Sequence, residues 1–297
     1  MIGLTHCVDT IYKGQRSGSY LFVKNKPNIT ILAEVHSKKL IIDEASRECK
    51  GVTVIDSSGA ELSFYATHEV ILSQGVFESP KLLMLSGIGP KNELSKHGID
   101  TLVDSRHVGQ NLLDHPGVPF VLKVKDGYGM DDHLLRRGPK HDSAVSAFNK
   151  GHAGPMGSGL LEMPNINLNF FADDLDIIAM REGIRFSYDI LTKGKGFKDV
   201  VLGEYPWEMP LDSDEEMHHA VLDRCQTAFH PCGTARLSKD IDQGVVDPKL
   251  KVHGISKLRV IDASVMPVIP DCRIQNSVYM VGEKGADMIK AEHKDLY

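Results

Sequence analysis

The sequence predicts a mixed α/β fold of the α+β type for this chain of 297 residues. Between residues 28 and 75, short runs rich in β-branched and aromatic residues alternate with turn residues, which is typical of strands. After residue 75 the apolar residues recur at helical spacing and capping residues precede several of them. The composition, 41% hydrophobic and 25% charged, is ordinary for a globular chain and allows one large or two modest domains.

Five runs are predicted to be strands, because each is short and β-rich and turn residues separate them. They cover residues 29–32, 39–42, 51–55, 61–65 and 69–72. The second, third and fourth runs are close enough along the chain for an antiparallel meander. The first and the last are apolar enough to be buried strands of a larger sheet.

The first helix is predicted soon after residue 75. Ser79 is expected to cap it and Pro80 to take its first position, where the missing N–H of proline costs nothing. The segment 86–90 contains two glycines and a proline and is expected to end the helix. Residues 126–163 are polar and glycine-rich, and are predicted to form a long loop.

Two more helices are predicted in the middle of the chain, at residues 175–191 and 213–227. Ser213 is expected to cap the latter, and Glu216, three residues on, could complete a capping box. The apolar face expected of the former is formed by Ile177, Ile178, Met180, Ile184 and Tyr188. Towards the C-terminus we expect a strand at 258–261, a turn, and a last helix at about 277–292.

Charge and cysteine content argue against several classes of function. A net charge of −6 gives no basic stripe for a nucleic-acid backbone. The five cysteines are scattered and form no Cys-x-x-Cys pair, so neither a disulfide framework nor a metal site is predicted. No apolar run approaches the roughly 20 residues of a membrane span, and residues 1–20 lack the layout of a secretory signal. We expect a soluble chain that binds a small molecule; its compartment and oligomeric state stay open.

Four stretches combine glycine, proline, histidine and asparagine in ways that core packing does not require. They are residues 75–89, 107–115, 229–235 and 260–267, the last continuing to 287–288. In this order the stretches resemble the signature motifs of the glucose-methanol-choline (GMC) oxidoreductases, and the resemblance extends over nearly the whole chain.

The resemblance implies a two-domain FAD enzyme. The fold would then be a remnant of an FAD-binding Rossmann-like domain combined with a partial antiparallel-sheet substrate domain. Residues 1–115 would be part of the FAD domain, with the meander and the GMC signature. Residues 116–225 would form the partial substrate domain with helices, and residues 226–297 would return to the FAD domain with the active-site motifs.

His230 matches the family's active-site histidine by position, and the resemblance implies that it faces the flavin. A histidine suits this place because its pKa lies near neutrality, so it can hold or pass a proton. The competing interpretation is a histidine of the core or of a helix cap. His107, His115 and His253 lie in family motifs too, but we expect them to support the structure rather than to react.

Arg273 occupies the position at which alcohol-oxidising members of the family usually have histidine or asparagine. Arginine presents a permanent cation with a planar fork that matches a carboxylate at two points, so the sequence predicts an anionic substrate. Its charge could also stabilise a reduced flavin. The competing interpretation is a surface ion pair with Asp271 or Asp287.

An arginine at this place, within residues 270–279, resembles the formate oxidases of filamentous fungi, a branch of the same family. That resemblance implies formate as substrate, O2 as acceptor and an FAD that is possibly the 8-formyl derivative. Removal of a hydride from formate requires no proton abstraction from a hydroxyl, so anchoring of the carboxylate matters most. A small alcohol as substrate, with Arg273 serving only the flavin, stays open.

Further cofactor contacts follow from the same motifs. The resemblance implies that the backbone of Val35 meets the adenine and that Asp262 and Ala263 lie near the diphosphate. It also places Gln275 and Asn276 in a flavin-facing turn, and Phe229 beside the active-site histidine. Asp262 could equally be a turn-forming residue, which is compatible with the binding role.

The sequence departs from the family in two places. The Gly-x-Gly-x-x-Gly fingerprint of the dinucleotide fold is absent, together with the acidic residue that follows it. A second shortening is expected near residues 161–164. We therefore expect an N-terminally and internally shortened member of the family, and a fragment that holds no flavin is a third hypothesis.

Overall fold

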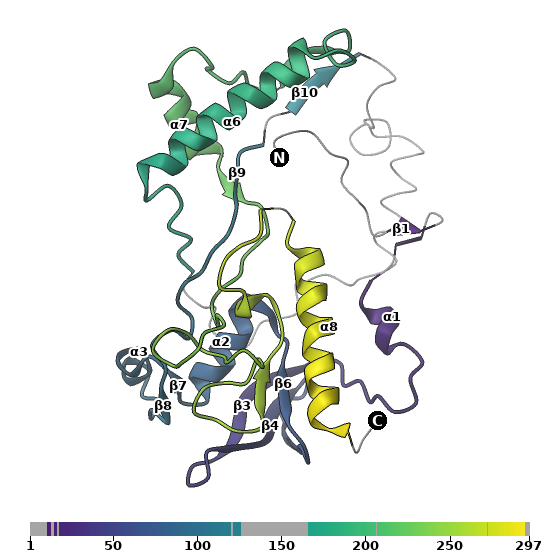
Figure 1. Cartoon of the computed structure of the whole chain (residues 1–297), viewed down its shortest axis with the longest axis vertical. Helices are drawn as coiled ribbons and strands as arrows, with labels where there is room; N and C mark the ends of the chain where they lie inside the picture. Colours follow the sequence, from purple (N-terminus) through teal and green to yellow (C-terminus); the bar gives the residue numbers. More distant parts are fainter. Residues whose placement is uncertain are drawn as a thin grey trace.

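The computed structural model describes residues 18–119, 121–125, 166–205, 207–271 and 273–294, and the strands β1 (Ile11–Tyr12) and β2 (Gln15–Arg16) by their backbone. It is a mixture of helices and strands, as predicted (Figure 1). The described residues form two apolar cores. The predicted loop at 126–163 and the expected shortening near 161–164 lie outside the described residues.

The predicted meander is confirmed. Strands β3 (Val35–Asp43), β4 (Glu48–Asp56) and β5 (Glu61–Tyr65) form one antiparallel sheet in the order β3-β4-β5. Its second turn is closed by Asp56, whose carboxylate accepts the backbone N–H groups of Ser58 and Ala60 at 2.8 and 2.9 Å. Short-range turn chemistry of this kind is what sequence patterns capture best.

A parallel pair joins distant parts of the chain. Strand β6 (Val70–Leu72) pairs with β13 (Leu258–Val260). Strand β6 was predicted, but its sheet has two strands and Ile71 is 41% exposed, so it is less buried than expected. A second parallel pair, β7 (Ile88–Gly89) with β8 (Val103–Asp104), flanks the short helix α3 (Lys91–Lys96). The first core collects around these pairs; among its completely buried members are Leu83, Ile88, Val108, Val245, Val246, Leu258 and Val260.

The predicted strand at 29–32 is wrong. These residues follow the short helix α1 (Tyr20–Val23) and belong to no strand. The side chains of Ile29, Ile31 and Leu32 are exposed. An extended apolar run forms a strand only where a neighbouring strand accepts its backbone hydrogen bonds, and the described residues supply none here.

Helix α2 (Gly75–Leu85) begins earlier than predicted, so Ser79 is not its cap and Pro80 lies inside it. Pro80 has no N–H for the carbonyl of Val76, four residues earlier. The hydroxyl of Thr234 donates to that carbonyl instead, at 2.5 Å. The helix therefore tolerates its proline because a residue of the 229–235 motif replaces the missing hydrogen bond.

The second core lies between α6 (Asp174–Lys193) and α7 (Asp214–Arg224), beside the antiparallel pair β10 (Val121–Val124) and β11 (Val201–Tyr205). Both helices were predicted, and Ser213 caps α7 by accepting the N–H of Glu216 at 3.2 Å. Ile178 was wrongly assigned to the apolar face of α6, because it is 43% exposed. The buried members of this core are Ile177, Ile184, Met209, Met217 and Val221.

The regions around the two cores are joined by extended segments of the chain (Figure 1). Strands β9 (Pro116–Gly117) and β12 (Gln226–Thr227) pair between them (Figure 1). The 3₁₀ turn η1 (Ala263–Val265) follows β13, and the predicted last helix, α8 (Gln275–Glu292), runs along the body with the first core. None of the helices in the described ranges is both long and apolar enough to cross a bilayer.

Candidate active site

Two of the sequence motifs meet directly beside β9 and β12. The N–H of Leu113 donates to the carbonyl of Cys232 at 3.0 Å, and the N–H of Cys232 donates to the carbonyl of Leu113 at 2.8 Å. Gly233 has a φ of +96°, and a side chain there would approach the carbonyl oxygen of Asn111 to 2.4 Å. Glycine is therefore required where the 107–115 and 229–235 segments come together.

Asp114 is the polar centre of this meeting point. Its Oδ1 accepts the backbone N–H of His115 at 2.7 Å and that of His230 at 3.0 Å. Its Oδ2 accepts the hydroxyl of Thr227. The hydroxyl oxygen of Thr227 in turn accepts the N–H of Phe229 at 3.0 Å. One carboxylate thus fixes the backbone on both sides of the contact, a role that the sequence analysis did not predict.

The imidazoles of His115 and His230 touch. Their Nδ1 atoms are 3.0 Å apart, and the rings stand edge to face at 90° with centroids 5.2 Å apart. Both side chains are half-buried. Of the other histidines in family motifs, His107 bonds the carbonyl of Asp242 at 2.8 Å and His253 bonds the hydroxyl of Ser238 at 3.1 Å, away from this pair.

The surroundings of His230 favour its neutral form. Burial lowers the pKa of the His230 imidazole, and the nearby His115 and Arg273 lower it further, while the Asp114 carboxylate partly opposes them. The structure therefore brings His230 and Arg273 close enough to influence each other electrostatically. A neutral imidazole beside a permanent cation is a suitable environment for an anion.

Arg273 is exposed and lies just before the first turn of α8. Gln275 and Asn276 are the first two residues of that helix and are also exposed. Among the described residues no side chain caps this end of α8, and its first turn contains no acidic residue. The partial positive charge of an 18-residue helix therefore adds to that of the guanidinium.

Phe229 precedes His230 in a left-handed backbone conformation, with φ at +61°. Its side chain is 80% exposed. A large side chain rarely adopts this conformation unless its neighbours impose it. Here the hydrogen bonds that Thr227 and Asp114 make to the N–H groups of Phe229 and His230 impose it, so the direction of His230 is set by the backbone.

Asp262 is a buried structural hub. Its Oδ1 accepts the N–H and the hydroxyl of Ser264 at 2.8 and 2.6 Å. Its Oδ2 accepts the N–H of Gly75 at 3.0 Å and the hydroxyl of Ser79 at 2.6 Å. The turn-forming interpretation is thus present in the structure, and the carboxylate also ties the start of α2 to η1. Its place near a diphosphate stays a prediction.

The two remaining predicted cofactor residues begin elements away from the histidine pair. Val35 is the half-buried first residue of β3 and lies opposite Asp56 in the three-stranded sheet. Ala263 is the first residue of η1, and its carbonyl accepts the N–H of Met266 at 3.3 Å. Neither belongs to the 111–118 or 225–235 segments.

The cysteines near the site are ordinary thiols. Cys225 and Cys232 are free, and so is Cys49, which lies away from the site in β4. Burial raises the pKa of the Cys232 thiol to about 11, and the negative charge of Asp114 contributes in the same direction. A thiol of this kind stays protonated at neutral pH and is a poor nucleophile, so the chemistry of the site does not involve it.

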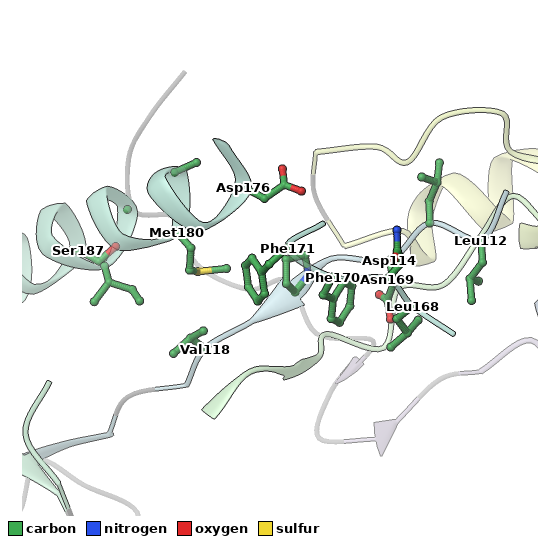
Figure 2. A pocket seen from close by; sticks show the side chains of 15 residues that line it. Leu112, Asp114, Val118, Leu168, Asn169, Phe170, Phe171, Asp176, Met180 and Ser187 are labelled. Atoms are coloured by element: carbon green, nitrogen blue, oxygen red, sulfur yellow. The ribbon is translucent and has the colours of Figure 1, made fainter. Parts of the chain in front are cut away.

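A cleft of about 740 Å³ adjoins Asp114. Figure 2 shows it between α6 and the segment that contains Leu112 and Asp114, with Phe170, Phe171 and Met180 along its wall. Aromatic and aliphatic side chains predominate, with Asp114 and Asp176 among the few charged ones. The sequence analysis missed this cleft, because residues from three separate segments, 112–118, 168–171 and 176–187, line it.

The sequence matches one family in two blocks. Residues 4–117 match the N-terminal part of the family described as GMC oxidoreductase, and residues 158–282 match its C-terminal part. Among curated proteins, choline oxidase of Arthrobacter globiformis is 33% identical over 94% of this chain and 59% of its own length. An oxygen-dependent choline dehydrogenase of Brucella ovis is 30% identical over 94% of the chain and 62% of its own length.

Among solved structures, a formate oxidase superposes with a TM-score of 0.90 at 62% identity, over 97% of this chain and 65% of that one. The same values hold for formate oxidase of Aspergillus oryzae with an arginine replaced by alanine or by lysine, structures that concern the effect of the substitution on FAD modification. The chain thus spans about three fifths of the length of these relatives. Since the two matched blocks together cover most of it, in the order of the family, the chain belongs to the GMC oxidoreductase family.

Proposed function

We propose that this chain carries the substrate-oxidising site of an FAD-dependent oxidase whose substrate is a small carboxylate, most simply formate. The observation that carries the proposal is the neighbourhood of a neutral imidazole, His230, and a permanent cation, Arg273, at the start of α8. The likeness to formate oxidase at 62% identity supports the choice of substrate.

The residues at the start of α8 fit the pyrimidine end of a flavin. That ring has electron-rich carbonyl groups, and the uncapped first turn of α8 offers backbone N–H groups with a partial positive charge. Gln275 and Asn276 would hold this end of the FAD, with His230 and Phe229 beside it. Val35, Asp262 and Ala263 would serve the adenine and diphosphate. We also propose the 8-formyl form of the cofactor.

The chain's own residues anchor and polarise the substrate. The guanidinium of Arg273 holds both oxygens of formate, which orients the C–H bond. His230 holds a proton near one of these oxygens. A bound flavin would supply the redox chemistry, as acceptor of the hydride from formate and donor of its two electrons to O2. The substrate leaves as CO2, and O2 takes up two electrons and two protons to become H2O2.

The domain assignment follows from this proposal. Residues 1–115 and 226–297 would contribute to the cofactor-binding domain, and residues 116–225 to the substrate domain. The division is supported by the two separate cores, because the second core draws its buried members from residues 177–221. The 740 Å³ cleft beside Asp114 would then be the approach for a small substrate.

An alcohol oxidase is the second candidate, since curated relatives include choline oxidase. Choline itself fits poorly, because a quaternary ammonium and the guanidinium of Arg273 repel each other. A small neutral alcohol avoids this repulsion. In that case Arg273 would act on the flavin rather than on the substrate.

The test is to purify the chain with FAD, record the flavin absorbance, and follow H2O2 release with formate, methanol and choline. We expect release with formate. Arg273→Lys and Arg273→Ala should lose formate turnover while the flavin is retained. Unchanged kinetics in these variants would refute the anion anchor, release with methanol alone would favour the alcohol oxidase, and absence of bound flavin would support the inactive fragment.

A further inference from the structure

The contact between His115 and His230 constrains where both rings carry their protons. A hydrogen bond between two imidazole nitrogens needs one donor and one acceptor. With the two Nδ1 atoms 3.0 Å apart, only one of them can carry a hydrogen. If both rings are neutral, they therefore adopt opposite tautomers, one with its proton on Nδ1 and the other with its proton on Nε2.

The protein holds this contact from both sides. Asp114 accepts the backbone N–H of His115 and that of His230 through the same oxygen. These bonds to a carboxylate are stronger than bonds between neutral groups, and they hold the two backbones together, so both rings project from fixed points of the chain. The contact joins residues 115 positions apart in the sequence, so it is a property of the folded site.

The direction of the hydrogen bond decides what His230 offers to a substrate. Its Nδ1 is occupied by His115, so Nε2 is the nitrogen left for the substrate. If His230 were the donor, Nε2 would present a lone pair to the carboxylate beside Arg273, and the two would repel each other. If His115 is the donor, Nε2 carries a hydrogen and binds the anion.

We propose that His115 is a positioning residue that donates its Nδ1 hydrogen to Nδ1 of His230 and thereby fixes His230 as an N–H donor at Nε2. The proposal rests on the proposed function, because an anionic substrate is what makes this tautomer the favourable one. In this arrangement His230 binds the carboxylate together with Arg273 and is not the base that deprotonates the substrate. Formate oxidation needs no such base.

The test uses the chain with ¹⁵N-labelled histidines, whose two-bond ¹H–¹⁵N spectra distinguish the tautomers. His230→Gln and His115→Leu assign the signals. We expect His230 to carry its hydrogen on Nε2, and to become a mixture of tautomers in His115→Leu. His115→Asn retains an N–H near the Nδ1 position and should restore the Nε2 form. His293→Leu, which alters a distant histidine, should leave the His230 signals unchanged.

A kinetic measurement accompanies the spectra. We expect the KM for formate to rise roughly threefold to tenfold in His115→Leu, the equivalent of one hydrogen bond, and to recover in part in His115→Asn. A hydrogen on Nδ1 of His230 in the unsubstituted chain, or unchanged tautomers in His115→Leu, would overturn the proposal.

The spectra need neither flavin nor turnover, so the two proposals fail separately. The predicted tautomer without formate-dependent H2O2 would refute the substrate and leave the control of His230 by His115 standing. Normal formate oxidation with the opposite tautomer would refute only the role of His115.

Discussion

The molecule contains two polar clusters built from the same kinds of residue, and they differ in how they are closed. At the far end of α8, the guanidinium of Arg259 bonds the carboxylates of Glu69 and Glu292, and Glu69 also bonds His293 at 2.9 Å. The other cluster, here called the open cluster, consists of one carboxylate, two histidines and one arginine: Asp114, His115, His230 and Arg273.

In the cluster of Arg259, Glu69, Glu292 and His293, here called the closed cluster, the side chains bond one another. The side chain of Arg259 is 1% exposed and that of Glu69 is 7% exposed, so charge neutralises charge inside the protein. Around His230 the carboxylate binds backbone N–H groups instead, and Arg273 remains exposed. The comparison teaches that the same residue types can form two different kinds of cluster, because the carboxylate meets a guanidinium in one and backbone N–H groups in the other.

The largest expected effect tests the closed cluster. Arg259→Met leaves the buried carboxylate of Glu69 without its cation and should lower the free energy of unfolding by about 3–5 kcal/mol. Arg273→Met is the matched control and should change it by less than about 0.5 kcal/mol, because Arg273 is exposed. Chemical denaturation followed by circular dichroism measures both. Equal losses would mean that the two arginines do not differ as described.

The next effect is on turnover. His230→Ala should reduce formate oxidation by about 100-fold or more while the thermal midpoint stays nearly the same. His293→Ala, in the closed cluster, should lower the thermal midpoint and leave formate oxidation nearly unchanged. The ring of His293 bonds Glu69 and packs against His68 with centroids 5.1 Å apart. H2O2 release and a thermal melt, recorded on both variants, give the comparison. A stability loss in His230→Ala alone would reverse the assignment.

A smaller effect appears on acidification. A hydrogen bond from Lys251 lowers the pKa of Glu292 below its usual 4.5, and Arg259 adds to this against the effect of burial. A lowered carboxylate pKa contributes stability that is complete above the unfolded value and is lost as the pH falls through the folded value. The chain should therefore lose stability below about pH 4.5. Glu292→Gln should lose less over the same range, and an identical loss would speak against the ion pair.

The smallest expected effect is on the pKa of His230 in the open cluster. The positive charge of Arg273 lowers the pKa of His230, so Arg273→Ala should raise it. For a histidine with a lowered pKa, the neutral form persists to a pH below the ordinary 6.5 and is lost on further acidification. An NMR titration of His230 in both proteins measures the difference. An unchanged pKa of His230 in Arg273→Ala would show that the two side chains do not interact.

The fold was predictable wherever the signal was local. The meander, α6, α7 and α8 follow from turn residues, caps and periodicity within a few residues. The start of α2 was missed because the group that receives the N–H of Gly75 is Asp262, 187 residues away. Residues 29–32 have the composition of a strand, but among the described residues no neighbouring strand pairs with them.

The site shows the same limit. The order of the motifs selected His230 and Arg273 as candidates, and the structure places them within electrostatic reach of each other. The contact of His115 with His230 and the grip of Asp114 on both backbones depend on how two distant segments meet, which spacing along the chain does not encode. The signal that was available is that Asp114 and His115 stand together at the end of the 107–115 motif.

The parallel pairing of β6 with β13 has a consequence for how the chain is made. Ser73, just after β6, bonds the carbonyl of Ile261, just after β13, and 188 residues separate them. At typical rates of synthesis, β6 waits roughly 10–40 s for its partner to leave the ribosome. During that time its backbone groups and the apolar residues around it stay uncovered. The first core therefore closes only after the 229–235 motif has been synthesised, and until then the nascent chain is a natural client for chaperones.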